Sequence, residues 1–437
     1  MKKLFKTKQE AIISSIGLVV IFGVFIYWWA NDDAVNIAGH VAALCSVVLF
    51  TFICLKFVPN WLEFWSKHDE EKAVGAKPKK GILIRIFLAF LAVDALSIVI
   101  IHYVRVFVFK DTTTFYEGLK LFLHTDAGAY LGIAESGYAF DRNLVFYPGY
   151  PILVSLFNYA INDYMLSGIA VSALFYALSA CVLYKLMILD FKHSDAIRAV
   201  EYFAILPGAF FFVCPMSESL FFFLCVSSIY LVRSEKWLPA CLAGAYCAFT
   251  RSLGVLVFAP LFFEAVRNRS LKQILMCFIV PLGTVAYLHI NYRVAGDFFA
   301  FSKLEEEYWG QSAGLFFDTT AFQIDNALAD IQQPWYTNAL GLWLPNVAWC
   351  FGALLLMCFA AKELRTSYMV WFICYYVIAI GATYLISAPR YLIACVPIYP
   401  AIVIVTINKK TRTIMPIICA VFALFYLFAF AARWEVF

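Results

Sequence analysis

The sequence predicts an all-α polytopic membrane protein, and three observations support this fold class. Of the 437 residues, 63% are hydrophobic and 14% are charged, and the mean hydropathy is +0.81. An ordinary soluble domain has about a quarter of its residues charged. Aromatic side chains make up 18% of the chain, as suits lipid-facing surfaces and interfacial belts. The apolar residues also recur in runs close to the roughly 20 residues that a membrane-spanning helix needs.

Eleven apolar runs are expected to be single transmembrane helices. They cover residues 11–30, 36–57, 82–108, 164–187, 197–214, 217–233, 272–292, 339–361, 367–386, 390–407 and 413–433. The first run follows a basic start, as a signal peptide would, but it is roughly 20 residues long and has no small-residue cleavage site. We therefore expect this run to be retained as a span.

The run at residues 237–266 is long for one helix and short for two, and the letters TRSLG interrupt it at 250–254. Short loops rich in Lys and Arg decide its path, because such loops tend to remain in the cytoplasm. These loops lie at residues 1–8, 78–85, 185–198, 233–236, 267–272, 362–365 and 408–412. All of these loops can lie on the cytoplasmic side only if residues 237–266 form a hairpin with Arg251 at its outer turn. The total is then about thirteen membrane segments, two of them short.

This orientation places the N-terminus inside, the C-terminus outside and the two longest loops outside. The large first extracytoplasmic loop covers residues 109–163, and the second covers 293–338. Within the first, the apolar but short stretch FYPGYPILVSLFNYAI at 146–161 is expected to dip only partway into the membrane. We divide the chain into an N-terminal pair of helices, a cytoplasmic linker and a main transmembrane domain, at residues 1–60, 61–81 and 82–437.

Several classes of site are not supported. The net charge is only +4 and the basic residues form no single face, so a nucleic-acid surface is not expected. The 13 cysteines lie within or beside apolar runs and form no C-x-x-C pair, and the six histidines are scattered. We therefore expect neither a disulfide framework nor a zinc site. There is no Walker A sequence, and no cofactor is expected; a divalent ion shared by Asp126 and Glu218 is the alternative left open.

The polar stretch HTDAGAYLGIAESGY, residues 124–138, supplies the first candidate for chemistry. It predicts a short helix with Thr125 as the N-cap, Asp126 in the first turn and Gly137 as the stop. Asp126 and Tyr130 would share one face of this helix. Two interpretations of Asp126 remain open. It either complements the helix N-terminus, which contributes under about 1 kcal/mol, or it is a carboxylate able to take a proton from a hydroxyl group.

Three further ionisable residues are expected at the outer ends of spans. PMSESL contains Glu218, FTRSLGV contains Arg251 and SAPRYL contains Arg390. Charges so close to hydrocarbon suggest function by default, and two arginines beside carboxylates fit the binding of a phosphate. The alternatives are snorkelling to the interface or a structural ion pair, such as Glu218 with Arg251.

Other acidic residues are less informative. Asp94 lies in the middle of AFLAVDALSIV, where it would either pack between helices or line a cavity. The run Glu305, Glu306 and Glu307 is expected to be a solvated loop face.

Five motifs follow one another along the chain: IAESGY, FYPGYP, PMSESLF, FTRSLGVLVFAP and APRYL. In this order they resemble the motifs of the PIG-V-like mannosyltransferases, which are integral membrane glycosyltransferases of the GT-C superfamily. The similar stretch runs from about residue 82 to the last span, and the first two spans lie outside it. The resemblance implies a GT-C fold, an inverting transfer and a polyprenyl- or dolichyl-phosphate-linked sugar donor.

Residue by residue, the resemblance implies that Asp126 is the catalytic base. Glu218, Arg251 and Arg390 match the ES, TR and PRY positions of the family, which implies contacts with acceptor or donor phosphate. The same motifs and the helix after Asp126 supply four tyrosines as substrate-binding candidates: Tyr130, Tyr147, Tyr150 and Tyr391. Thr125 stands where the family usually has Trp, which leaves the sugar and the acceptor open.

The expected function is therefore transfer of a hexose, in the first instance mannose, to a lipid or glycan acceptor on the non-cytoplasmic face. The membrane would be the cell membrane in a bacterium and that of the endoplasmic reticulum in a eukaryote. A transporter or flippase of lipid-linked glycans is the main alternative, although we find no internal repeat of the kind that many transporters show. A related transferase of another sugar and an assembly subunit are also left open.

Overall fold

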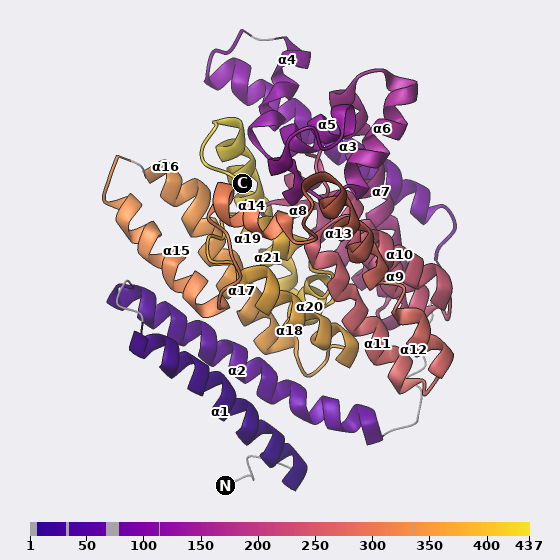
Figure 1. Cartoon of the computed structure of the whole chain (residues 1–437), viewed down its shortest axis with the longest axis vertical. Helices are drawn as coiled ribbons and strands as arrows, with labels where there is room; N and C mark the ends of the chain where they lie inside the picture. The colour runs from indigo at the N-terminus through magenta and orange to yellow at the C-terminus, as the bar shows by residue number, and fades with distance from the viewer. Residues whose placement is uncertain (1–6, 32–34, 67–77, 113, 335) are drawn as a thin grey trace.

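The computed structural model describes residues 7–31, 35–66, 78–112, 114–334 and 336–437, and every regular element within these ranges is a helix (Figure 1). Residues 1–6 of the basic N-terminus and 67–77 of the predicted linker lie outside the described residues. The α-helices are α1 (Lys8–Asn31), α2 (Ile37–Ser66), α3 (Ile82–Tyr103), α4 (Phe115–Leu119), α5 (Ala127–Ser136), α6 (Gly149–Ile161), α7 (Tyr164–Asp190), α8 (His193–Ile205), α9 (Glu218–Arg233), α10 (Trp237–Ala248), α11 (Phe258–Arg267), α12 (Leu271–Cys277), α13 (Pro281–Ala295), α14 (Ala300–Trp309), α15 (Phe316–Ile331), α16 (Tyr336–Asn338), α17 (Leu344–Ala360), α18 (Thr366–Ile380), α19 (Ala388–Ile393), α20 (Ile398–Val405) and α21 (Lys409–Ala431). Short 3₁₀ or π segments are η1 (Val104–Val108), η2 (Lys120–His124), η3 (Asp141–Val145), η4 (Ala209–Phe212), η5 (Ser252–Val257) and η6 (Ala339–Trp343).

Seven helical stretches among the described residues are long and apolar enough to cross a membrane. They are 8–31, 37–64, 82–108, 164–190, 271–295, 336–360 and 409–431, and each coincides with a predicted span. The other four predicted spans are shorter or interrupted. Two of them, α9 and α18, have only 16 and 15 residues. The other two are interrupted: a break at Pro207 separates α8 from η4, and a break at Pro397 separates α19 from α20. Helices break there because the residue before a proline disfavours the helical conformation. The protein is thus polytopic, but the count of thirteen is not reproduced.

Ion pairs bring several of the predicted basic loops together at one end of the bundle, which we call the basic-loop end. The Arg233 guanidinium, at the end of α9, pairs with Asp190 at the end of α7 (2.7 Å) and donates to the hydroxyl of Tyr368 at the start of α18 (3.3 Å). Arg365, just before α18, pairs with Glu264 of α11 at 2.7 Å. The shared side that the charge pattern predicted for these loops is therefore present.

Residues 237–267 form the predicted hairpin. α10 packs antiparallel to α9, with the Ser228 hydroxyl donating to the carbonyl of Ala240 at 2.7 Å. At the far end of α10 the chain turns through Arg251, whose side chain contacts Ser217 at the other end of α9. η5 and α11 then run back to Glu264 at the basic-loop end. The turn at Arg251 consequently lies at the opposite end of the bundle, which we call the site end.

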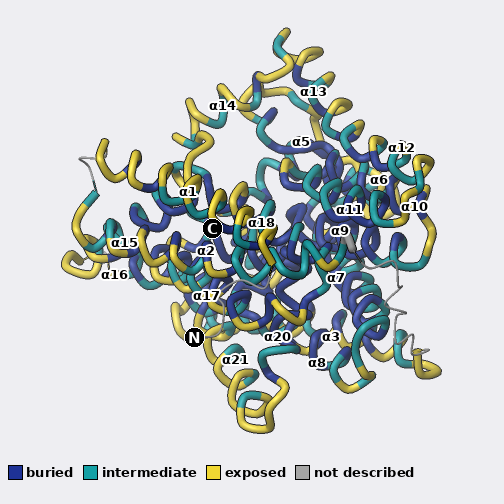
Figure 2. Tube along the Cα trace, turned by 90° about the horizontal axis from the view of Figure 1, so that it is seen from below, coloured by how far each residue is buried: buried dark blue, intermediate teal, exposed yellow. Residues whose placement is uncertain are grey.

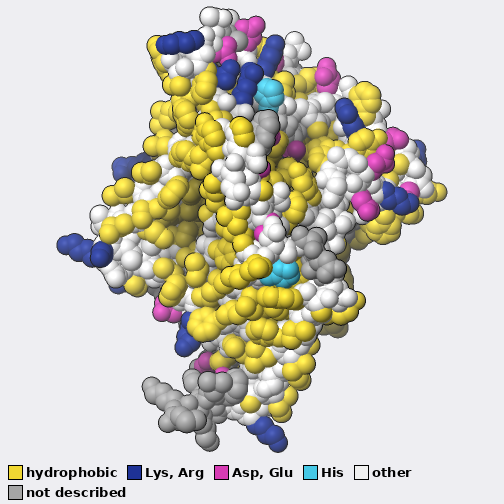
Figure 3. All heavy atoms as spheres, turned by 90° about the vertical axis from the view of Figure 1, so that its left-hand side faces the viewer, with side chains coloured by type: hydrophobic (Ala, Val, Ile, Leu, Met, Phe, Trp, Pro, Cys, Tyr) yellow, Lys and Arg dark blue, Asp and Glu magenta, His cyan; other side chains and the backbone are white. Residues whose placement is uncertain are grey.

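The N-terminal helices α1 and α2 pack along one flank of the bundle (Figure 1). α2 contacts α15 and α17. The backbone N–H of Asn36 donates to Asp325 of α15 at 2.8 Å, and Lys56 donates to the carbonyl of Cys358 at 2.5 Å. Hydrophobic side chains cover most of this flank, and charged ones gather mainly at its margins (Figure 3). An apolar belt of this kind is what a lipid-facing surface requires.

The two long loops cover the site end with short helices. The first contains α4, α5 and α6, and the second contains α14 and α15. α6 has 13 residues, too few to cross a bilayer, as the prediction of a partial dip requires. Its first residue, Gly149, is bonded to the end of the hairpin, since its N–H donates to the Phe249 carbonyl (3.1 Å) and its own carbonyl accepts from Tyr246 (2.8 Å).

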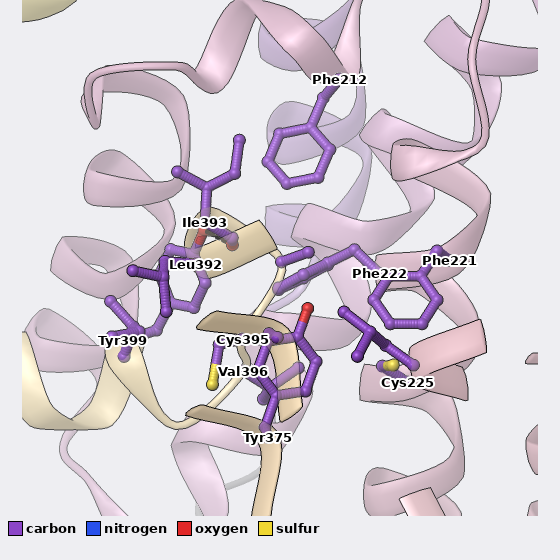
Figure 4. Packing of buried hydrophobic residues seen from close by; sticks show 14 of the residues in the cluster. Phe212, Phe221, Phe222, Cys225, Tyr375, Leu392, Ile393, Cys395, Val396 and Tyr399 are labelled. Carbon is purple, nitrogen blue, oxygen red and sulfur yellow. Dashed lines mark hydrogen bonds between the residues drawn. The ribbon is translucent and has the colours of Figure 1, made fainter. Parts of the chain in front are cut away.

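A buried apolar core supports the site end from below. Phe222 of α9 stacks on Phe203 of α8 at 4.5 Å between ring centroids, and its ring also lies 5.4 Å from that of Tyr399 of α20. Figure 4 shows residues of α9, α18 and the α19–α20 segment meeting in this core. α7 and α9 lie in the buried interior, whereas α21 and the outer-loop helices carry many exposed residues (Figure 2). The short helix α19 therefore rests on a rigid base.

Substitution of Gly283 by Ala is expected to destabilise the protein, because a Cβ at this position would lie 1.8 Å from the carbonyl oxygen of Ala245 where α13 crosses α10. Overpacking of this kind costs about 1–3 kcal/mol. Gly352→Ala is the matched control, since its Cβ would meet nothing within 4 Å. The apparent melting temperature in detergent should fall for Gly283→Ala only. Equal shifts in the two variants would contradict the close crossing.

Candidate active site

Four charged side chains that are far apart in sequence meet at the site end. We call them the charged cluster: Asp126, Glu218, Arg251 and Arg390. The Arg390 Nη2 atom lies 2.8 Å from Asp126 Oδ2 and 2.6 Å from Glu218 Oε1. Arg251 Nη1 lies 2.5 Å from the same Glu218 oxygen. The cluster contains two positive and two negative groups, so its formal charges cancel.

Glu218 is the centre of the cluster. Its Oε1 atom accepts hydrogen bonds from Arg390 Nε, Arg390 Nη2 and Arg251 Nη1. Its side chain is only 1% exposed, and Oε2 is buried without a partner among the described residues. As the first residue of α9, Glu218 also has the helix N-terminus beneath it, which favours negative charge. The structural ion pair with Arg251 that the sequence allowed is present, and Arg390 extends it.

Arg251 is held by the tight turn of the hairpin. Its backbone is extended, with φ −154° and ψ 153°, and Gly254 follows it where a Cβ would lie 2.1 Å from the Cys247 carbonyl oxygen. The guanidinium carbon lies 5.7 Å from the Phe221 ring and 5.3 Å from the Tyr391 ring. Nη1 bonds Ser217 and Glu218, which leaves Nε and Nη2 without a hydrogen bond to the described residues. These donors are available to an anion.

Arg390 lies in α19, which the core of Figure 4 supports. The helix begins at Ala388, whose N–H donates to Asn346 Oδ1 at 3.0 Å, and Pro389 occupies the first turn, where its missing N–H has no cost. The guanidinium carbon lies 5.6 Å from the ring of Phe211. With a side chain that is 5% exposed, Arg390 presents little surface besides its contacts with the two carboxylates.

Asp126 is the most exposed member of the cluster, with 34% of its side chain accessible. The predicted cap is wrong by one residue: α5 begins at Ala127 and Asp126 is its N-cap residue. Thr125 still contributes, since its hydroxyl oxygen accepts from the N–H of Ala127 at 3.3 Å. The Asp126 carboxylate makes no capping hydrogen bond because it points to Arg390. Gly137 ends the helix with φ +67°, as predicted.

The four candidate tyrosines lie at different depths. The Tyr130 hydroxyl is 2.9 Å from that of Ser217, which bonds Arg251, and Tyr391 flanks Arg251. Tyr147 is stacked on Tyr287 at 3.7 Å. Tyr150 is fully buried, and its hydroxyl donates to the Gly168 carbonyl at 2.8 Å. Tyr130 and Tyr391 thus join the cluster directly, whereas contact of Tyr147 and Tyr150 with a substrate stays a prediction.

The predicted solvated run on α14 divides into two kinds of residue. Glu306 and Glu307 are exposed, but Glu305 is half-buried. The i, i+4 spacing of Phe301, Glu305 and Trp309 places an acid between two aromatic residues on one helix face, and this signal could have indicated its burial.

Asp94 does not belong to the charged cluster. It is 4% exposed, and neither of its carboxyl oxygens has a hydrogen-bond partner in the described ranges. Within the same ranges, no group of three or more His, Cys, Asp or Glu side chains is placed to hold a metal ion.

Comparison with known proteins finds similarity over much of the chain. The family described as "Mannosyltransferase (PIG-V)" matches residues 108–406. A protein named GPI mannosyltransferase 2 from Drosophila pseudoobscura pseudoobscura is 32% identical over 167 residues, which are 34% of this chain and 36% of that protein. GPI mannosyltransferase 2 of Drosophila melanogaster is 26% identical over 195 residues, 39% and 43% of the two chains. GPI alpha-1,6-mannosyltransferase 2 of Homo sapiens is 28% identical over 145 residues, 30% and 29%. The matched stretches therefore span less than half of each relative.

Neutralising Glu218 is expected to destabilise the fold strongly. Glu218→Gln leaves two buried guanidinium groups without their shared counter-charge, and breaking a buried ion pair by removing one partner costs about 3–5 kcal/mol. Glu201→Gln, at an exposed position of α8, is the matched control and should leave stability unchanged. Thermal unfolding of both variants in detergent checks this prediction. An unchanged melting temperature for Glu218→Gln would show that the arginines do not depend on this carboxylate.

Proposed function

Because this chain belongs to the mannosyltransferase (PIG-V) family, we propose that it transfers a mannosyl group from a polyprenyl- or dolichyl-phosphate-linked donor to a hydroxyl group. The acceptor is a lipid or a glycan, and the reaction takes place on the non-cytoplasmic face. The matched relatives are named for GPI mannosyl transfer, which supports a glycolipid as one acceptor of this chain.

The observation that carries the proposal is the placement of Asp126 beside Arg251 and Arg390 in one cluster. A guanidinium fork matches the oxygens of a phosphate, and Arg251 retains donors that no described residue uses. Asp126, whose side chain is partly exposed, pairs with Arg390. The site thus contains a carboxylate to take the proton of the attacking hydroxyl and guanidinium groups to hold the departing lipid phosphate.

In the proposed reaction the acceptor oxygen attacks the anomeric carbon of the donor sugar as Asp126 takes the hydroxyl proton. A bond forms between this oxygen and the carbon, and the bond from the carbon to the phosphate oxygen breaks. The lipid phosphate leaves with the electron pair, and its charge is held by Arg251 and Arg390. A single displacement of this kind inverts the anomeric configuration, and no protein nucleophile is needed.

The ion pair between Asp126 and Arg390 has a role in this sequence of events. In the absence of donor, Arg390 holds the Asp126 carboxylate at 2.8 Å. A bound phosphate competes for the same guanidinium and frees the carboxylate to face the acceptor. Glu218 is buried beside both arginines, compensates their charge and holds them in position to bind the phosphate throughout.

The proposal also includes a GT-C fold, with the shorter and interrupted helices completing about thirteen membrane segments. The large loop at 109–163, which contributes Asp126, supports this architecture. The location is the membrane of the endoplasmic reticulum in a eukaryote or the cell membrane in a bacterium, with the site end facing away from the cytoplasm. Basic loops gathered at the opposite end support this orientation.

Replacing Asp126 by Asn is expected to lower transfer at least about 100-fold, because a general base contributes 10² to 10⁴ in rate. The assay uses membranes supplied with radiolabelled polyprenyl-phosphate mannose and follows label in the acceptor fraction. Glu135→Gln, an exposed acid of the same helix, is the matched control and should retain full activity. Transfer by Asp126→Asn at the wild-type rate would refute the assigned base.

The Arg251→Lys variant is expected to raise the KM for the donor by about tenfold. Lysine keeps the charge but not the planar fork that binds two phosphate oxygens at once. Arg142→Lys, an exposed arginine of the same outer surface, should leave this KM unchanged. A donor KM that is equal in the Arg251 and Arg142 variants would argue against a phosphate at Arg251.

A further inference from the structure

The helix α14 has an inward face that meets the aromatic residues around the site. Phe301 lies 5.5 Å from the ring of Tyr287, and its N–H donates to Asn291 Oδ1 at 3.0 Å. Two turns later, Trp309 lies 5.8 Å from the ring of Phe146. Residues 302, 303 and 306–308 of the same helix are exposed. Glu305 falls between the two aromatic residues, on the inward face.

Glu305 differs from the other acids of the site, because it has no cationic partner among the described residues. The ion pairs of Arg251 and Arg390 are made with Glu218 and Asp126. Burial raises the pKa of Glu305 to about 7. A half-buried carboxylate without a counter-charge can still accept hydrogen bonds from a ligand.

Aromatic rings connect the inward face of α14 to the helix that follows Asp126. Trp309, one turn after Glu305, lies 5.8 Å from the ring of Phe146. The Phe146 ring in turn lies 5.2 Å from that of Tyr130, one turn after Asp126. The face of α14 that carries Glu305 is therefore linked to α5 through Phe146.

The segment that follows α14 fixes the position of this helix relative to α19. The amide of Gln311 donates to the carbonyl of Tyr384 at 3.0 Å, and the N–H of Gly314 donates to that of Gly381 at 2.5 Å. Ala313 and Ala382 form an isolated antiparallel bridge. Since the segment at 381–384 leads directly into α19, the end of α14 is tied to the helix that carries Arg390 and Tyr391.

We propose that Glu305 binds hydroxyl groups of the acceptor sugar and thereby determines acceptor specificity. This inference rests on the proposed function. A carboxylate accepts from two neighbouring sugar hydroxyls, and aromatic rings beside it offer the apolar face that a sugar ring packs against. The acceptor is favoured over the donor because Phe146 links the Glu305 face of α14 to α5, which follows Asp126, the base that must contact the acceptor hydroxyl. The donor phosphate belongs with the arginines.

The test measures two KM values for Glu305→Gln in membranes, with radiolabelled polyprenyl-phosphate mannose as donor and octyl α-mannoside as added acceptor. The KM for octyl α-mannoside is expected to rise about tenfold or more, as the loss of a hydrogen bond to a charged group implies. The KM for the donor should stay within about twofold. Glu305→Asp keeps the charge and is expected to give an intermediate acceptor KM. Glu307→Gln, exposed on the same helix, is the matched control and should leave both values unchanged.

The other outcomes distinguish failure of this inference from failure of the proposed function. An unchanged acceptor KM in Glu305→Gln, with wild-type transfer intact, overturns this inference and leaves the proposed function standing. A rise in both KM values, with a lower melting temperature, shows that Glu305 only supports α14 and also overturns it. If the wild type labels the lipids of the membrane but not octyl α-mannoside, the acceptor KM is measured with the extracted lipids, and the same outcomes apply. If it labels neither, the proposed function fails and this inference fails with it.

Discussion

The site depends on one buried carboxylate that neutralises two guanidinium groups. Glu218 is almost fully enclosed, and a single one of its oxygens receives three donors from Arg251 and Arg390. In a medium of low dielectric constant, burying two guanidinium groups without such a counter-charge would be strongly unfavourable. The three elements that carry these residues, α9, the hairpin turn and α19, must therefore keep their relative positions, and Asp126 is aligned through Arg390.

The surrounding fold holds these three elements rigidly. The aromatic core formed by α8, α9 and α20 packs against α19 (Figure 4). The returning arm of the hairpin, α11, is anchored at the basic-loop end by the pair of Arg365 with Glu264. The apolar flank formed with α1 and α2 faces outward (Figure 3). The bundle thus has an apolar flank suited to lipid, and the ion pairs of the charged cluster and of the basic loops lie at its opposite ends.

The outer loops contribute two acids to the site end. α5 begins beside the partly exposed carboxylate of Asp126, and α14 contributes Glu305, which lies between two aromatic residues of that helix. In the proposed reaction the two arginines bind the phosphate of the lipid-linked donor, and the two acids contact the acceptor. The donor and the acceptor then occupy separate parts of the site.

The sequence alone determined the membrane class, seven spans and the identity of the charged residues, because hydropathy and the cost of a charge near hydrocarbon are local properties of the chain. It also located the hairpin turn and the stop at Gly137. Only the tertiary structure decided that Glu218 binds Arg390 as well as Arg251, since these residues are separated by 172 positions. The same holds for Asp126, whose carboxylate points to a distant arginine and not to its own helix. The spacing of Phe301, Glu305 and Trp309 indicates which face of α14 turns inward, but only the packing of α14 against α13 and η3 decides that Glu305 is half-buried.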